Sequence, residues 1–215
     1  MLVGAPGAGK GTQAQLLAKR LGVPHIASGD LFRSHVRGGT PLGRDAERYI
    51  AAGALVPDAL TVRMIEQRLA DTDAAEGAIL DGFPRTRPQA EALDALLARK
   101  GGRVAGALYI DVDRDVLLAR ISGRWLCRQS PDHVYHDQAR PPRKAGRCDV
   151  DGSPLYQRDD DKPATVRARL DKQLPPMFEV IDYYAAQGVL STVDGDQPID
   201  EVTDALLRVI AAPAR

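Results

Sequence analysis

Near its start the chain reads Gly4-Ala5-Pro6-Gly7-Ala8-Gly9-Lys10-Gly11-Thr12, after the apolar pair Leu2-Val3 and before a helix-like pattern over residues 13–21. Glycines let the backbone turn tightly and direct its N–H groups toward an anion, and the helix that follows adds the positive end of its dipole. Lys10 supplies a compact positive charge, and Thr12 a hydroxyl one residue later than in the general pattern. We therefore predict a strand, a phosphate loop over residues 4–12 and a helix.

Apolar runs alternate with helical patterns along the rest of the chain, which is typical of a parallel sheet covered by helices. Besides residues 2–3, the predicted strands are residues 23–26, 78–80, 107–112 and 189–193. The predicted helices are residues 88–100, 113–122, 165–186 and a last one from 198, and we expect Pro175-Pro176 to kink or break the third. Because the first strand is so short, we expect a weakened core there, as a truncated or misplaced start would give.

Two stretches depart from this alternation. Residues 30–68 read as three successive helices, and residues 123–161 are rich in Pro, Asp, Arg and Gly without helical periodicity. A structureless segment of the second length is unusual inside a compact domain. We therefore predict that residues 123–161 form a small β-rich lid.

Composition limits the function classes. In 215 residues, Lys plus Arg and Asp plus Glu both number 29, so no overall field attracts nucleic acid or an anionic membrane. The sequence shows neither an apolar run of membrane-spanning length nor a leader, so we expect a cytoplasmic protein. The only cysteines, Cys127 and Cys148, lie in one region, which favours a local purpose over a disulfide framework.

A second group of residues points to the same cleft as the phosphate loop. Asp81 follows the predicted strand at residues 78–80, so its carboxylate lies at the carboxyl edge of the sheet, where it can orient Mg²⁺ through water. Arg85 follows in a rigid turn, and an arginine can bind a phosphate with two parallel hydrogen bonds. Gln89 comes one helical turn later, with an acceptor and a donor suited to a base edge. This set predicts phosphoryl transfer between nucleotides.

Besides Lys10-Gly11-Thr12, the chain carries Ser28-Gly29-Asp30-Leu31-Phe32-Arg33, Leu55-Val56-Pro57-Asp58, Asp81-Gly82-Phe83-Pro84-Arg85-Thr86 with Gln89, and the pair Arg158 and Arg169. Together these motifs resemble the bacterial adenylate kinases of the long-lid type, within the nucleoside monophosphate (NMP) kinases. The resemblance implies an α/β fold of the P-loop NTPase type, with a parallel five-stranded sheet flanked by helices, a helical NMP-binding insertion and a small β-rich lid. It also implies reversible phosphoryl transfer from ATP to AMP, giving two ADP.

The resemblance further implies a division of the chain. The core would be residues 1–27, 57–122 and 162–215, the NMP-binding domain residues 28–56 and the lid residues 123–161. Lid closure would exclude water, which would otherwise compete for the phosphoryl group. The expected cofactor is Mg²⁺ bound with ATP. The expected partners are ATP, AMP and ADP, with no nucleic acid and no membrane, and we expect a monomer.

Site residues are carried over by position in the same way. The implied catalytic residues are Lys10, Arg85, Arg124, Arg158 and Arg169. ATP would meet Gly7, Ala8, Gly9, Lys10, Gly11, Thr12, Arg120, Arg124, Val134, Tyr135 and Gln197. AMP would meet Ser28, Arg33, Ala54, Leu55, Val56, Gly82, Phe83, Pro84, Arg85, Gln89, Arg158 and Arg169. Magnesium would be held through water by Thr12 and Asp81. Ala54 and Gln197 stand where lysines are frequent, and Ala139 where an aromatic residue often packs.

The lid cysteines admit three interpretations. Zinc-bearing lids of this family resemble Cys-x2-Cys followed by Cys-x2-Cys or Cys-x2-Asp, and here those places hold Cys127, Ser130, Cys148 and Asp151. They could form a thiol–polar network, a disulfide, or a three-ligand zinc site completed by water or by His133. Because serine is a poor zinc ligand, we expect no structural metal in the lid.

Two other functions remain as alternatives. A kinase for UMP or CMP would share the phosphate loop and the arginines, although Gln89 and the long lid favour AMP by resemblance. A non-catalytic nucleotide-binding module is the second alternative. A GTP switch would need an Asn-Lys-x-Asp guanine reader, which the sequence lacks. The basic lid residues are offset by acidic ones, which argues against a nucleic-acid module.

Overall fold

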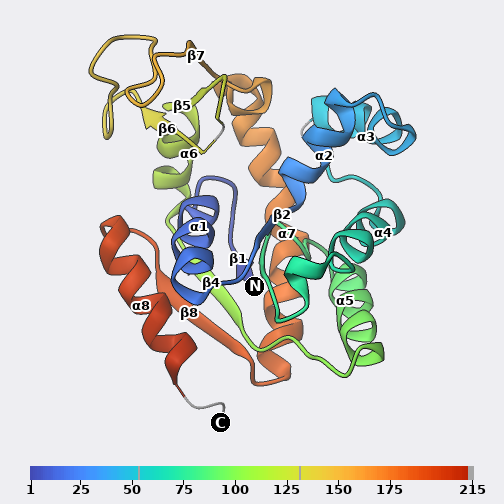
Figure 1. The fold of residues 1–215 in the computed structure, drawn as a ribbon. Coiled ribbons are helices and arrows are strands. Elements are labelled where there is room, and N and C mark those ends of the chain that lie inside the picture. The colour runs from blue at the N-terminus through green and yellow to red at the C-terminus, as the bar shows by residue number, and fades with distance from the viewer. Residues whose placement is uncertain (53, 131, 213–215) are drawn as a thin grey trace.

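The computed structural model describes residues 1–52, 54–130 and 132–212. Its centre is a five-stranded sheet with the order β2-β3-β1-β4-β8, and all its pairings are parallel (Figure 1). The strands are β1 (Leu2–Val3), β2 (His25–Ala27), β3 (Ile79–Asp81), β4 (Ala107–Asp111) and β8 (Leu190–Asp194). The predicted five-stranded α/β fold is confirmed.

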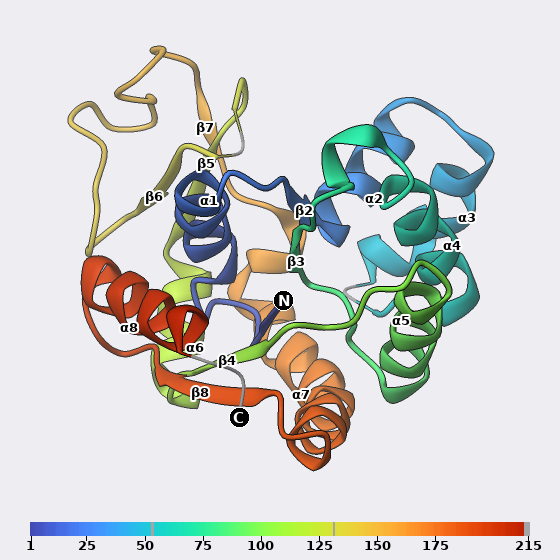
Figure 2. The ribbon, with the colours of Figure 1, turned by 60° about the horizontal axis from the view of Figure 1, so that its bottom comes forward.

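Helices cover the sheet on both sides (Figure 2). The first of them, α1 (Lys10–Leu21), packs against α8 (Ile199–Ala211), whereas α5 (Arg87–Arg99) and α6 (Arg114–Ser122) pack against α7 (Pro163–Ala186). The sequence explains where these helices begin. Thr86 and Asp113 accept hydrogen bonds from the backbone N–H groups of Gln89 and Asp115, and Pro198 directly precedes α8. The predicted helices are present.

The long helix α7 differs from the prediction because it runs unbroken through Pro175 and Pro176. Two prolines remove the N–H groups that would bond the carbonyls of Asp171 and Lys172. Both of those residues are exposed, so water can satisfy the carbonyls. Buried side chains before and after the prolines, among them Val166, Leu170, Val180 and Tyr184, also hold both halves in the core. Tertiary packing therefore outweighs the local cost.

The first strand is as short as expected but occupies the middle of the sheet. Leu2 pairs with Asp81 of β3 and with Leu108 of β4. The side chains of Leu2 and Val3 are 2% and 3% exposed, so packing is continuous through the strand. This strand delivers the phosphate loop to the carboxyl edge of the sheet.

Both insertions have the predicted character. The first contains α2 (Ser28–Arg37), α3 (Pro41–Ala51) and α4 (Asp58–Arg68), and a short 3₁₀ turn (Thr72–Ala74) follows. The second, which we call the lid (residues 123–161), contains an antiparallel sheet of the order β6-β5-β7. Its strands are β5 (Arg124–Cys127), β6 (Val134–His136) and β7 (Leu155–Tyr156), and a 3₁₀ turn (Asp159–Asp161) leads into α7. Among the described residues, no helix is both long and apolar enough to cross a membrane.

Candidate active site

The last residues of the phosphate loop are already helical, because α1 begins at Lys10. Gly7 has a φ of +86°, and a Cβ there would lie 2.6 Å from Cγ1 of Ile121, so a side chain is excluded. The Lys10 ammonium donates hydrogen bonds to the carbonyls of Gly4 (2.8 Å) and Ala5 (2.9 Å). Thr12 lies half-buried in the first turn of α1. Loop, lysine and helix end thus have the arrangement that an anion site requires.

Burial and neighbouring charges have opposing effects on the pKa values of Lys10 and Asp81, beside the loop. Burial lowers the pKa of Lys10 from 10.5 to about 8, while the nearby Asp81 carboxylate opposes this and Arg85 adds to it. Burial acts to raise the pKa of Asp81, but the neighbouring His25 imidazole and the charge of Lys10 hold it below its usual range. His25 Nε2 lies 3.4 Å from Asp81 Oδ2. A bound phosphate would add negative charge and favour the charged lysine.

A pocket lies between α2, the segment before α4 and the turn after β3. Its lining includes the predicted AMP-site residues Ser28, Arg33, Ala54, Leu55, Val56, Gly82, Arg85, Gln89 and Arg169. It also includes residues that the sequence did not indicate: Phe32, Ile50, Thr61, Asp160 and Gln173. Three other predicted residues, Phe83, Pro84 and Arg158, do not line it. Phe83 is 1% exposed and packs in the core below the pocket.

Arg85 projects into this pocket from the turn after β3. Its Nε donates to the carbonyl of Gly82 at 2.6 Å, and its side chain lies 3.5 Å from Ser28 Oγ. Burial lowers the pKa of Arg85 to about 10, and the charge of Arg169 contributes. Such a buried guanidinium, close to a second one, favours an anion between them.

Gln89 is held in place by its neighbours. Its Oε1 accepts from the Arg85 backbone N–H at 2.8 Å, and its Nε2 donates to Asp58 Oδ1 at 2.7 Å. The side chain is 1% exposed. Gln89, the residue predicted to recognise the base, therefore lines the pocket but is hydrogen-bonded to Asp58. The sequence alone did not connect Asp58 to Gln89.

Three arginines converge where the lid joins α7. Arg124 makes two hydrogen bonds to Asp161 (2.6 and 2.9 Å), and Arg169 pairs with Asp160 (2.9 Å) and Asp161 (3.1 Å). Burial lowers the pKa of Arg158 and of Arg169. Within the described residues, Arg158 Nε and Arg169 Nε are buried donors without a hydrogen-bond partner. Buried donors of this kind suit incoming phosphate oxygens.

The predicted ATP-site residues of the lid and the chain end are more dispersed. Arg120 donates to the Gly195 carbonyl at 2.9 Å, and Gln197 donates to Asp194 Oδ2 at 2.7 Å. Val134 is half-buried on β6. The Tyr135 side chain points into the lid interior, where its hydroxyl lies 3.4 Å from Cys148 Sγ, so only its backbone is available to ATP. Gln15 of α1 donates to Asp132 of the lid at 2.7 Å.

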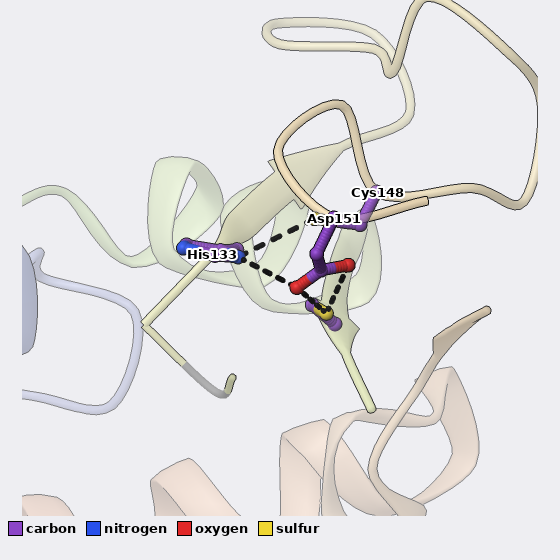
Figure 3. Close-up of side chains that lie close together, drawn as sticks. His133, Cys148 and Asp151 are labelled. Carbon is purple, nitrogen blue, oxygen red and sulfur yellow. Dashed lines mark hydrogen bonds and ion pairs between the residues drawn. The ribbon is translucent and has the colours of Figure 1, made fainter. Parts of the chain in front are cut away.

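A separate cluster lies inside the lid. The side chains of Cys127, His133, Cys148 and Asp151 converge, with their potential ligand atoms all within 4.8 Å of one another (Figure 3). Both cysteines are buried and reduced. Ser130 instead contributes its backbone N–H, which lies 3.5 Å from Cys127 Sγ. Of the groups that the sequence offered beside the two cysteines and Asp151, the structure brings the His133 imidazole into the cluster and not the Ser130 hydroxyl.

Several charged contacts of the site were not predicted. His25 and Asp81 meet because β2 and β3 are neighbours in the sheet, and Asp160 and Asp161 meet the arginines because the chain turns into α7. The acidic run at residues 159–161, directly after Arg158, could have indicated carboxylate partners for the arginines of the site. No local pattern linked Asp58 to Gln89.

Comparison with known proteins agrees with this geometry. Residues 2–189 match the family model for adenylate kinase. The curated adenylate kinase of Streptomyces avermitilis is 48% identical over 97% of this chain and 96% of its own length. That of Salinispora tropica is 50% identical over 94% and 93%, and that of Moorella thermoacetica 47% identical over 98% and 96%. The chain therefore belongs to the adenylate kinase family, whose enzymes transfer a phosphoryl group to a nucleoside monophosphate.

Proposed function

We propose that this enzyme catalyses the reversible reaction ATP + AMP ⇌ 2 ADP. The observation that carries the proposal is one pocket whose lining includes three arginines suited to a phosphate, Arg33, Arg85 and Arg169, together with Gln89, which is suited to a base. The phosphate loop stands beside it at the same edge of the sheet, since β1 and β3 are paired neighbours. Two phosphate-binding sites side by side are what direct transfer between nucleotides requires.

In this mechanism the phosphate loop and Lys10 hold the ATP phosphates, and Arg33 and Arg85 hold the AMP phosphate. Arg124, Arg158 and Arg169 neutralise the charge that develops on the transferred group, which is where most of the rate in phosphoryl transfer arises. Thr12 and Asp81 would hold Mg²⁺ through water, and the cation would supply positive charge beside the ATP phosphates. Half-buried Thr12 and the ionised Asp81 carboxylate fit such a cation because oxygen ligands suit Mg²⁺.

We further propose the division into core, NMP-binding domain (residues 28–56) and lid (residues 123–161) as the moving units of the cycle. The lid meets α1 through the Asp132–Gln15 contact, and α3 contacts the 3₁₀ turn at the lid's end. Closure of both units would exclude water from the reacting phosphates. We also propose a monomeric enzyme, since the pocket and the phosphate loop are formed within one chain and the reaction needs no residue from a partner.

A coupled assay of ADP formation with ATP and each of AMP, GMP, CMP and UMP tests the proposal. We expect AMP to have the highest kcat/KM, because the Gln89 amide lines the pocket and keeps a second N–H and a second lone pair beyond its bonds to Asp58 and the Arg85 backbone. If UMP or CMP exceeded AMP tenfold, the enzyme would be a pyrimidine nucleotide kinase. If none reacted while ATP still bound, the chain would be a binding module.

A further inference from the structure

Gln89 combines deep burial with a place in the lining of the pocket proposed for AMP. Its side chain is 1% exposed and lines that pocket. Its backbone is fixed at the start of α5, where Thr86 Oγ1 accepts from the Gln89 N–H at 3.3 Å. A buried amide satisfies part of its hydrogen-bonding capacity within the protein and can use the remainder on a ligand. The protein partners of Gln89 therefore decide what it offers to a base.

Two of these partners fix the direction in which the Gln89 amide points. Its Oε1 accepts from the Arg85 backbone N–H at 2.8 Å, and its Nε2 donates to Asp58 Oδ1 at 2.7 Å. A backbone N–H can only donate, and an ionised carboxylate can only accept. The reversed amide would therefore place donor against donor at Arg85 and acceptor against acceptor at Asp58.

Without such partners, an amide has little preference between its two orientations. The terminal torsion of a glutamine side chain is broad and roughly two-fold. Rotation by 180° exchanges the oxygen and the nitrogen without changing the volume of the side chain. Hydrogen bonds to an ionised group are roughly twice as strong as those between neutral groups. Of the two partners, Asp58 therefore contributes more to the orientation of Gln89.

The orientation of the amide determines which purine it can recognise. Beyond its two bonds within the protein, Gln89 keeps one N–H and one lone pair on Oε1. Adenine has an acceptor at N1 beside a donor at its 6-amino group, whereas a 6-oxopurine has a donor at N1 beside an acceptor at O6. An amide that matches one of these edges matches the other only after rotation by 180°. Fixing the amide thus selects between bases of nearly equal size.

The fold brings Asp58 to Gln89 because α4 packs beside α5. Asp58 is the first residue of α4 and is half-buried. It is not part of the pocket lining that the described residues form, so it acts on a ligand through Gln89. A carboxylate in the first turn of a helix also stabilises that helix through the dipole. The two roles can be separated by experiment, since only the first changes the choice of base.

We propose that Asp58 is a positioning residue that holds the Gln89 amide in the orientation for adenine and against 6-oxopurines. The inference rests on the proposed function, because it concerns the base of the nucleoside monophosphate in that pocket. It adds the residue that determines which purine Gln89 accepts. Asp58 makes no contact with the base in this role.

The ratio of kcat/KM for AMP to kcat/KM for IMP measures this selection, because the two nucleotides differ only at N1 and at position 6 of the purine. Asp58→Asn keeps the shape of the side chain and can present a donor to Gln89 in place of an acceptor. We expect the AMP/IMP ratio to fall by roughly 10–100-fold, which is the range for a hydrogen bond to a charged group. The loss with AMP should appear in KM for AMP, with kcat and KM for ATP within about twofold.

Glu66→Gln is the matched control. Glu66 also joins α4 to α5, through an exposed ion pair with Arg99 at 3.1 Å, and it lies further along α4. This variant should leave the AMP/IMP ratio unchanged. In a Gln89→Ala background, Asp58→Asn should have no further effect on the ratio, because no amide remains to be oriented. A role for Asp58 in helix stability alone would lower the free energy of unfolding and leave the ratio as it is.

Asp58→Ser replaces Asp58→Asn if the latter does not fold. Serine also suits the start of a helix, and its hydroxyl ends one bond short of the carboxylate oxygen. The proposal is wrong if folded Asp58 variants keep the AMP/IMP ratio of the unmodified enzyme, or if the ratio changes equally with and without Gln89. Failure of the proposed function is a different result, in which the unmodified enzyme prefers a pyrimidine nucleotide or uses no acceptor, and the role of Asp58 is then rejected with it.

Discussion

Arg124 grips Asp161 with two parallel hydrogen bonds, from Nε to Oδ2 at 2.9 Å and from the terminal nitrogen to Oδ1 at 2.6 Å. Asp161 is completely buried, and Arg169 contacts the same carboxylate at 3.1 Å. Two arginines proposed to meet the transferred phosphate are thus partnered by one carboxylate at the lid's end. The Asp161 carboxylate supplies the negative charge that phosphate oxygens would otherwise supply to these arginines. It also fixes both guanidinium groups near the site.

Asp161→Asn tests this arrangement. We expect the free energy of unfolding to fall by roughly 3–5 kcal/mol, because breaking a buried pair leaves the arginine charges uncompensated. Saturating ADP should reduce the difference in the free energy of unfolding between the variant and the unmodified enzyme, since the ADP phosphates supply the negative charge that Asp161 no longer carries. The control is Asp159→Asn, whose exposed partner is Lys162 and which should change stability by less than about 0.5 kcal/mol. Urea unfolding with and without ADP provides the measurement, and equal losses in the two variants would contradict the interpretation.

Arg85 and Arg87 offer a matched pair for the AMP site. Arg85 lines the pocket, whereas the side chain of Arg87 is 60% exposed and pairs with Glu91. Loss of two charge-assisted hydrogen bonds to phosphate, about 1.5 kcal/mol each, corresponds to roughly a hundredfold decrease in kcat/KM. We therefore expect Arg85→Ala to lower kcat/KM for AMP about a hundredfold, and Arg87→Ala to stay within twofold. Steady-state kinetics at saturating ATP would decide, and a normal rate in Arg85→Ala would remove it from the site.

We expect Lys10→Met to lower activity while it raises stability at pH 7. Burial lowers the pKa of Lys10 from 10.5 to about 8, so between these values the unfolded chain binds more protons than the folded one. Stability from this group therefore rises with pH across that window, and at pH 7 the buried charge is destabilising. We expect the variant to lose most turnover, yet to be about 1–3 kcal/mol more stable at pH 7. This gain should shrink toward pH 10.5.

The exposed Lys19 on the same helix provides the control, since Lys19→Met should keep both turnover and its pH profile of stability. Thermal or urea unfolding at pH 7 and pH 10, beside the coupled assay, gives both readings. A Lys10→Met variant that is less stable at pH 7 would show that its hydrogen bonds to Gly4 and Ala5 outweigh the cost of burial.

Much of this architecture could be predicted because its signals are local. The phosphate loop, the alternation of strands and helices, and caps such as Asp113 each depend on residues near in sequence. The unbroken α7 could not be predicted, since packing of Leu170 and Val180 in the core overrides the local effect of two prolines. His25 beside Asp81 required the strand order, which periodicity does not give.

In the lid cluster, too, some features could be predicted from the sequence and others required the structure. The resemblance to the family's lids placed Cys127, Ser130, Cys148 and Asp151 in one group, because these residues stand at the positions of a linear pattern. The choice between Ser130 and His133 depends on how one turn directs its side chains, and a spacing rule does not contain that information. The structure brings the imidazole of His133 to the cluster and leaves Ser130 to donate its backbone N–H.

The contact between Gln15 and Asp132 joins the helix of the phosphate loop to the residue directly before His133. Gln15 Nε2 donates to Asp132 Oδ1 at 2.7 Å across a long separation in sequence. An exposed hydrogen bond contributes about 0.5–1.5 kcal/mol, so its loss should favour lid opening by roughly two- to tenfold. We expect Asp132→Ala to raise KM for ATP by a factor in that range, with KM for AMP unchanged, because the AMP pocket lies away from this contact.

A double-mutant cycle makes that prediction specific. Gln15→Ala alone should raise KM for ATP as much as Asp132→Ala does, and the two together should have no further effect, since both remove one bond. Asp149→Ala is the control, because that carboxylate accepts from Arg143 within the lid and should leave KM unchanged. Additive effects of Gln15→Ala and Asp132→Ala would mean that the two side chains do not act as one contact when ATP binds.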